Sequence, residues 1–227
     1  MTQDKRTEIN IALIYDNTVY QSGLTPDWGF SAHIRVGEQN ILFDTGSDGH
    51  ILLENMRMMN IDPMNIDTVF ISHNHFDHIG GLAAFLRVNY DVDVIIPSSL
   101  RGVKRAKRVI EVTTPLTLLD GVFSTGELLG IEQSLMIKTS AGIVLVVGCS
   151  HPGLKNIIHV AKQQGHIHAI IGGLHDFDDF DILCDIDYIC PTHCSSYISE
   201  IAKRYPEKYI QGGAGKRIKL PYFKEEK

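Results

Sequence analysis

Long apolar stretches are absent from this sequence. Continuous runs such as IVLVV at 143–147 are far shorter than the roughly 20 apolar residues that a membrane-spanning helix needs. The first residues, MTQDKR, are polar and lack the apolar core of a secretory signal peptide. We therefore expect no membrane association and a cytoplasmic location.

Cysteine and linker-like sequence are also scarce. The 4 cysteines among 227 residues are too few, and too clustered toward the C-terminus, for a disulfide framework, so we expect reduced thiols. No low-complexity segment divides the chain, and its 44% of hydrophobic residues can form one substantial core. The sequence predicts a single domain over residues 1–227.

An excess of positive charge is lacking as well. The formal net charge of -6 argues against broad nucleic-acid binding and leaves a small-molecule substrate as the expected partner. The exception is RGVKRAKR at 101–108, where five of eight residues are cationic. We interpret this segment first as the solvated face of a helix. The alternative is an element beside the active site that binds the anionic group of a phosphorylated substrate through Lys104, Arg105, Lys107 and Arg108.

Short β-branched and apolar runs alternate with turn residues along most of the chain. A first sheet is predicted from the runs at 9–15, 30–36, 41–43 and 68–72. Further strands are predicted at 92–96, 109–113, 121–124, 135–139, 143–147, 168–171, 188–190, 209–210 and 217–220. Helices are predicted from a cap at Ser47 or Asp48 to Asn60, and over 82–87, 154–161 and 196–204. This pattern indicates sheets covered by helices. We expect Trp28 and Phe30 in the core, and the alternative is that they stack on an aromatic ligand.

Residues 73–78, HNHFDH, place three imidazoles and one carboxylate in six positions directly after an apolar run. In an extended segment His73 and His75 project to the same side and can hold one ion. A turn at Phe76 would then direct Asp77 and His78 toward a second ion. Imidazole and carboxylate ligands suit borderline divalent ions. The donor set therefore predicts one or two divalent metal ions without choosing among zinc, iron and manganese, and zinc is our first expectation.

Three more histidines lie in the second half of the chain. His151, His175 and His193 each come one to four residues after a predicted strand, in loops where sites on rigid scaffolds usually form. Glycine and proline surround all three, and the metal motif upstream favours a functional role for them. We expect them to reach the same cleft as residues 73–78.

The spacing His-x-His-x-Asp-His, followed by Gly80 and Gly81, resembles the signature of the metallo-β-lactamase fold superfamily. Further segments extend the resemblance in order: WGFS at 28–31, ILFDTG at 41–46, GCSHPG at 148–153, GGLH at 172–175 and PTHC at 191–194. Together they are similar to a branch that contains the dihydropterin ribofuranosylaminobenzene phosphate synthase of methanogens and many metal-dependent hydrolases. The resemblance implies an α+β fold, a four-layer αβ/βα sandwich with the metal site at one edge of the two sheets.

The resemblance also implies roles for individual residues. Six side chains would bind metal, with His73, His75 and His151 on one ion and Asp77, His78 and His193 on the other. Asp44 would orient the ligating histidines. Asp77 would also orient or deprotonate the nucleophile, and His175 would be a ligand or a hydrogen-bond partner of the substrate.

The chain departs from the wider superfamily at 148–150, where GCS offers no aspartate at a place where a bridging carboxylate is common. This departure leaves open whether two ions are held, or one tightly and one weakly. Cys149 would either bridge the ions as a thiolate or pack as a small buried side chain beneath the site, and both interpretations stay open.

The leading functional hypothesis is a metal-dependent hydrolase that uses metal-activated water on a small substrate. One alternative is a transferase similar to the pterin-related synthase, and another is a metal-binding or redox protein without hydrolase activity. A nuclease is disfavoured, because only the basic segment supports it. The loops expected to line the cleft carry no signature of a particular substrate.

Overall fold

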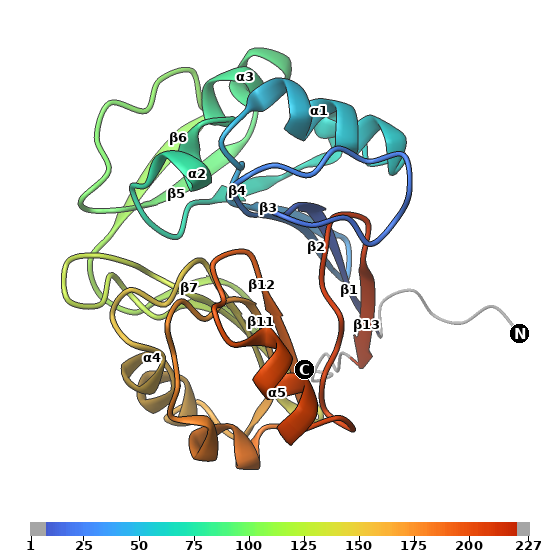
Figure 1. The fold of residues 1–227 in the computed structure, drawn as a ribbon. Coiled ribbons are helices and arrows are strands. Elements are labelled where there is room, and N and C mark those ends of the chain that lie inside the picture. The colour runs from blue at the N-terminus through green and yellow to red at the C-terminus, as the bar shows by residue number, and fades with distance from the viewer. Residues whose placement is uncertain (1–7, 222–227) are drawn as a thin grey trace, which may run out of the picture.

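The computed structural model describes residues 8–221, which form two β-sheets packed face to face with helices on their outer sides (Figure 1). Within 8–221, every helix is too short or too polar to cross a membrane. The architecture is the mixed α and β sandwich that the resemblance implies.

The first sheet has seven strands in the order β13-β1-β2-β3-β4-β5-β6. Its strands are β1 (Glu8–Tyr15), β2 (Ser31–Val36), β3 (Gln39–Phe43), β4 (Thr68–Phe70), β5 (Asp93–Pro97), β6 (Arg108–Val112) and β13 (Arg217–Pro221). The β13-β1-β2-β3 part is antiparallel, and β3 to β6 run parallel. Its helices are α1 (Gly49–Met58), the 3-10 helix η2 (Pro63–Asn65), α2 (Phe76–Ile79) and α3 (Leu82–Val88).

The second sheet has six strands in the order β12-β11-β10-β9-β8-β7. Its strands are β7 (Leu116–Leu119), β8 (Val122–Ser124), β9 (Leu135–Thr139), β10 (Gly142–Val147), β11 (Ile167–Gly173) and β12 (Tyr188–Thr192). β10, β11 and β12 run parallel, and the rest of the sheet is antiparallel. Its helices are α4 (Leu154–Lys162), the 3-10 helix η3 (Phe180–Asp185) and α5 (Ile198–Arg204).

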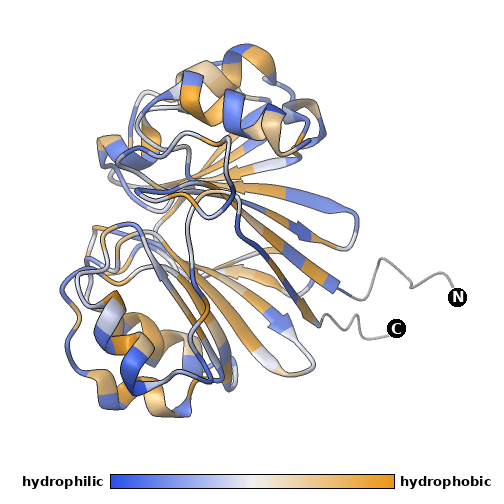
Figure 2. Ribbon diagram, turned by 45° about the vertical axis from the view of Figure 1, so that its right-hand side comes forward, coloured by the Kyte–Doolittle hydropathy of each residue, from blue (hydrophilic) through white to orange (hydrophobic). Residues whose placement is uncertain are grey.

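Three apolar layers hold the sandwich together. The central layer joins the facing sides of the two sheets, for example Ile11 of β1 and Val144 of β10. A second layer packs α1 and α3 on the first sheet, and a third packs α4 and α5 on the second. Figure 2 shows mainly hydrophobic residues along the strands and a mixture of hydrophobic and hydrophilic residues in the helices. Successive strand residues therefore point alternately into the core between the two sheets and into the core between a sheet and its helices.

Parallel strands of both sheets end at one edge of the sandwich. β3 and β4 lead into the residues at 44 and 71–78, and β10, β11 and β12 lead into those at 148–151, 174–175 and 193. Because the carboxyl ends of parallel strands lie at the same edge, the predicted site residues from both halves of the chain meet there.

Most predicted elements are confirmed within one to three residues, and Asp48 caps α1 by accepting the backbone N–H groups of residues 50 and 51. One strand was not predicted and two expectations are wrong. β7 has no counterpart among the predicted strands, and residues 209–210 form only an isolated bridge to Ile189. The basic segment is not a helix: 101–107 has no regular structure and Arg108 starts β6. Left-handed backbone at Gly102 (φ 80°) and Arg105 (φ 62°) is incompatible with a continuous right-handed helix.

Candidate metal centre

The segment after β4 carries the first candidate ligands. His75 is extended, with φ −106° and ψ 147°, and α2 begins at the next residue, so the chain turns at Phe76 as predicted. A Cβ added to Gly80 would lie only 2.1 Å from the backbone oxygen of Ser47. This close approach requires glycine and fixes α2, which carries Asp77 and His78, against the loop after β3.

Five imidazole rings from three loops lie in contact. The ring centroid of His73 is 4.5 Å from that of His75, 4.1 Å from that of His78 and 4.8 Å from that of His151. The rings of His75 and His151 are 4.6 Å apart, and those of His78 and His193 are 5.0 Å apart. The structure thus brings together every histidine that the resemblance assigns to metal binding.

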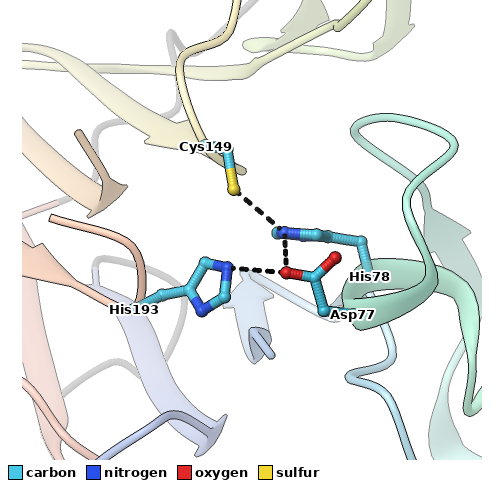
Figure 3. A group of neighbouring side chains, drawn as sticks. All are labelled: Asp77, His78, Cys149 and His193. Carbon is cyan, nitrogen blue, oxygen red and sulfur yellow. Dashed lines mark hydrogen bonds and ion pairs between the residues drawn. The ribbon is translucent and has the colours of Figure 1, made fainter. Parts of the chain in front are cut away.

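The potential ligand atoms form two groups, in each of which all atoms lie within 4.8 Å of one another. The Asp77 group consists of Asp77, His78, Cys149 and His193 (Figure 3). The His73 group consists of His73, Cys149 and His151. With the exposed His75 beside the second group, each group has enough donors for one divalent ion.

The imidazoles present nitrogen atoms without partners. Burial, and then the nearby imidazoles, lower the pKa of His73 far below its usual range, and burial likewise lowers the pKa of His78. Nε2 of His73 and Nε2 of His151 are buried and have no hydrogen-bond partner among residues 8–221. Because buried polar atoms are seldom left unpaired, these neutral nitrogens fit the role of metal ligands.

Asp44 connects the first sheet to the site. It follows β3 in a left-handed conformation (φ 52°) and is fully buried. Its Oδ2 lies 2.7 Å from Nδ1 of His78, and Ser72 donates its backbone N–H to Oδ1 and its hydroxyl to Oδ2. The Nδ1 contact leaves Nε2 of His78 facing the Asp77 group. Asp44 therefore has the geometry of a residue that orients a metal ligand.

Two residues at the end of β1 hold His193. Asp16 accepts the backbone N–H of His193 at 3.0 Å, and Oδ1 of Asn17 lies 3.0 Å from its Nδ1. Nε2 of His193 then lies 3.2 Å from Oδ2 of Asp77. Asp16 and Asn17 were not predicted as site residues, because they are 177 and 176 residues away from His193 in the chain. The one feature that could have pointed to them is their position as two polar residues directly after a strand.

Glu132 is a second unpredicted residue, and it shapes the loop after β10. It is fully buried, and its Oε1 accepts the backbone N–H groups of Gly148, Cys149 and Ser150 at 3.0 to 3.1 Å. Its Oε2 accepts the N–H of His151 at 2.9 Å. Burial raises the pKa of Glu132, while these N–H groups oppose that rise. One carboxylate thereby fixes the backbone of two candidate ligands.

His175 lies at the rim of the centre. Its side chain is 46% exposed, and its Nδ1 is 3.0 Å from Oδ2 of Asp176. Its ring centroid is 5.1 Å from that of His151, but it is in neither group. This position suits contact with a substrate better than contact with an ion.

Trp28 is not in the core, contrary to expectation, although Phe30 is. Trp28 is 58% exposed, and its ring centroid lies 5.1 Å from that of His193. The next two residues explain why the indole is exposed. Gly29 donates its N–H to Asn17, and Phe30 donates its N–H to the backbone oxygen of Asp77. The loop is thereby tied to the metal centre, with the indole outside.

The predicted anion-binding cations make their contacts outside the two ligand groups. Lys107 and Arg108 form ion pairs with Asp91 and Asp93. Lys104 and Arg105 line a cavity of about 500 Å³ between α3 and the segment at 100–105, beside apolar residues such as Leu82, Leu86 and Leu100. That lining contains none of the residues of the two groups.

Comparisons with known proteins agree with this geometry. Residues 26–124 match the metallo-beta-lactamase superfamily. The chain is 28% identical to the 7,8-dihydropterin-6-methyl-4-(beta-D-ribofuranosyl)-aminobenzene-5'-phosphate synthase of Methanocaldococcus jannaschii, over 92% of this chain and 95% of the synthase.

Solved structures share the fold. A metal-dependent hydrolase of the beta-lactamase superfamily superposes with a TM-score of 0.75 at 23% identity, covering 94% of this chain and 99% of that one. The short form of human tRNase Z superposes with a TM-score of 0.60 at 14% identity, covering 92% and 98%. The predicted fold and the predicted resemblance are therefore confirmed.

Proposed function

From the premise that this chain has the metallo-β-lactamase fold, we propose that it is a metal-dependent hydrolase acting on a small molecule. The observation that carries the proposal is the pair of ligand groups at the edge where both sheets end. In these groups, Nε2 of His73 and Nε2 of His151 are buried and have no hydrogen-bond partner among the described residues, which is costly unless an ion binds them.

Six side chains would hold the ions: His73, His75 and His151 for one, and Asp77, His78 and His193 for the other. A bound divalent ion supplies a Lewis acid and lowers the pKa of water to about 7. Imidazole and carboxylate donors suit zinc, iron and manganese. Zinc remains the first expectation among these ions.

Two residues would act on the reacting molecules. The contact with His193 and the nearby imidazole of His78 keep the pKa of Asp77 low even though burial raises it, so the carboxylate is ionised. Asp77 would accept a hydrogen bond from the attacking water and orient it. The exposed His175 would donate a hydrogen bond to the substrate at the rim.

Metal content of protein purified without added metal tests the proposal, with His75→Ala and His193→Ala compared with wild type. We expect close to two equivalents in wild type and a loss in each variant. Metal-loaded wild type is then screened on phosphoesters, lactones and thioesters. One equivalent or less, with no change in His193→Ala, would contradict the two-ion site. Bound metal without turnover of any ester would favour a metal-binding or redox protein.

A transferase reaction on an aromatic substrate is the second candidate. The relative from Methanocaldococcus jannaschii is named a synthase, and its name contains a dihydropterin and an aminobenzene. The exposed indole of Trp28 beside His193 favours this candidate, because a flat ring could stack on it next to the ligand groups.

Substitution of Trp28 separates the two candidates. If an aromatic substrate stacks on the indole, Trp28→Ala raises KM for that substrate about tenfold and Trp28→Phe retains most of the affinity. A hydrolase of aliphatic esters would tolerate both changes. Product analysis completes the test, since a transferase moves a group from one substrate to another and releases the remainder of the donor, whereas a hydrolase consumes water.

A further inference from the structure

Cys149 is the one residue common to both ligand groups among the described residues. Its Sγ lies within 4.8 Å of the donor atoms of Asp77, His78 and His193, and also within 4.8 Å of those of His73 and His151. In Figure 3 the sulfur points from the loop after β10 toward His78. The distance from Sγ to Nε2 of His78 is 3.1 Å. The sulfur therefore lies between the two groups.

The backbone that carries this sulfur has little freedom. Glu132 accepts the N–H of Cys149 and of the residues on either side of it. A Cβ added to Gly148 would lie 2.3 Å from the hydroxyl oxygen of Ser72, so the loop packs directly on the segment before His73. The backbone position of Cys149 is thus fixed relative to the loop after β4, which carries His73.

The surroundings of the sulfur are those of a ligand rather than of a packing residue. Cys149 is 3% exposed, yet its sulfur lies 3.1 Å from Nε2 of His78 and within 4.8 Å of further imidazole nitrogens and a carboxylate oxygen, with the thiol of Cys194 also beside it. A cysteine that only fills space is surrounded by apolar groups. Nε2 of His73, on a side chain that is 1% exposed, has no hydrogen-bond partner in the described chain and belongs to the same group as the sulfur.

We infer that Cys149 is a thiolate ligand shared by both metal ions, in the place that a bridging carboxylate takes elsewhere. The inference rests on the metal-dependent function proposed above. On binding, the thiol loses its proton to solvent and the sulfur forms a bond to each ion, so the bridge contributes one negative charge. A soft bridging ligand favours thiophilic ions such as zinc and cadmium over magnesium or manganese.

The neighbouring thiol of Cys194 provides a matched control. Its Sγ lies 3.8 Å from the backbone oxygen of Cys149, but it is in neither ligand group. Cys194→Ser should therefore leave the metal spectra unchanged, whereas Cys149→Ser should alter them. Both changes are nearly isosteric, and circular dichroism checks that each variant folds.

Metal spectroscopy on the full-length protein gives readouts that do not depend on activity. We expect Co²⁺ added to metal-free wild type and to Cys194→Ser to produce a thiolate-to-cobalt charge-transfer band, and Cys149→Ser to lose it. In wild type loaded with two ¹¹³Cd²⁺ ions, both NMR resonances should fall in the thiolate-ligated range and split each other through the shared sulfur.

The outcomes separate this inference from the proposed function. Two bound ions without a thiolate band, or a band that persists in Cys149→Ser, would overturn the bridge and leave the hydrolase intact. Only one shifted ¹¹³Cd resonance would make Cys149 a ligand of a single ion and also overturn the bridge. Failure of wild type to bind any ion would overturn both. The cadmium spectrum of wild type decides the matter even if Cys149→Ser does not fold.

Discussion

The two ligand groups differ in how firmly the protein holds them. In the Asp77 group, His78 and His193 each have Nδ1 within 3.0 Å of a side-chain oxygen, from Asp44 and Asn17 respectively. In the His73 group, Ser72 contacts Nδ1 of His73 at 2.9 Å and His151 is only half-buried, while His75, which lies beside the group, is exposed. Imidazoles fixed through their second nitrogen bind metal more tightly. We expect the Asp77 group to be the more rigid and the higher-affinity half of the centre.

The largest effect should come from removing the buried imidazole of His78, and removal of the exposed imidazole of His75 provides the contrast. His78→Ala should destabilise the metal-free protein by roughly 2 to 3 kcal/mol, because a buried carboxyl group loses its partner and a cavity opens. His75→Ala should change the free energy of unfolding by less than about 0.5 kcal/mol, since the side chain is exposed. Urea unfolding after chelator treatment measures the change in the free energy of unfolding for both variants, with His50→Ala, at an exposed position, as control. Equal decreases in stability for His78→Ala and His75→Ala would contradict the difference in rigidity between the two groups.

Asp44→Asn should lower affinity for the ion in the Asp77 group by roughly 10- to 100-fold and leave the other ion nearly unaffected. An amide of the same size cannot accept both contacts of Ser72 and also that of His78. Competition with a coloured chelator gives the two affinities. Asp27→Asn is the matched control, because Asp27 contacts Tyr15 and Ser47 but no imidazole. A uniform decrease for both ions would argue against a local role for Asp44.

Glu132→Gln should destabilise the protein by about 1 to 3 kcal/mol, because a carboxamide leaves at least one buried N–H of the loop at 148–151 unsatisfied. Amide hydrogen exchange in that loop should accelerate. Glu127→Gln is the control, since Glu127 accepts hydrogen bonds from Ser98 and Ser99 instead. If loop exchange stays at the wild-type rate, Glu132 does not hold the loop.

The smallest effect is expected at Asn17. Asn17→Ala should lower metal affinity up to about tenfold, because His193 loses the partner of Nδ1 while Asp16 still holds its backbone. Asn17→Asp retains an acceptor oxygen for Nδ1 but loses the Nδ2 donor that contacts the backbone oxygen of His193 at 2.9 Å, so it should restore part of the affinity. A titration with Zn²⁺ compares the three proteins, and an aspartate no better than alanine would contradict this role.

The metal motif was predictable because its residues are close in sequence. Residues 73–78 supply three imidazoles and a carboxylate, and strand periodicity locates the loops of His151 and His193. Asp16, Asn17 and Glu132 were not predictable, because their partners lie far away in the chain and their roles exist only after both sheets have formed. They are ordinary polar residues until folding places N–H groups and imidazoles around them.

The errors also have physical causes. Hydrophobicity places Trp28 in the core, but hydrogen bonds of Gly29 and Phe30 attach this loop to the centre and turn the indole outward. The run of cations at 101–108 favours the solvated face of a helix, but two residues with positive φ prevent a helix there. Local pattern predicts the strands well, whereas tertiary contacts decide where a loop side chain points.

Trp28 is the only tryptophan of the chain, and its ring lies 5.1 Å from that of His193. The intrinsic fluorescence of this protein therefore comes almost entirely from one fluorophore beside the metal centre. An ion with unpaired electrons at His193 would quench that emission, and a ligand covering the indole would shift its wavelength. The fold thus carries a built-in optical reporter, which allows occupancy of the centre to be followed in unlabelled protein and in real time.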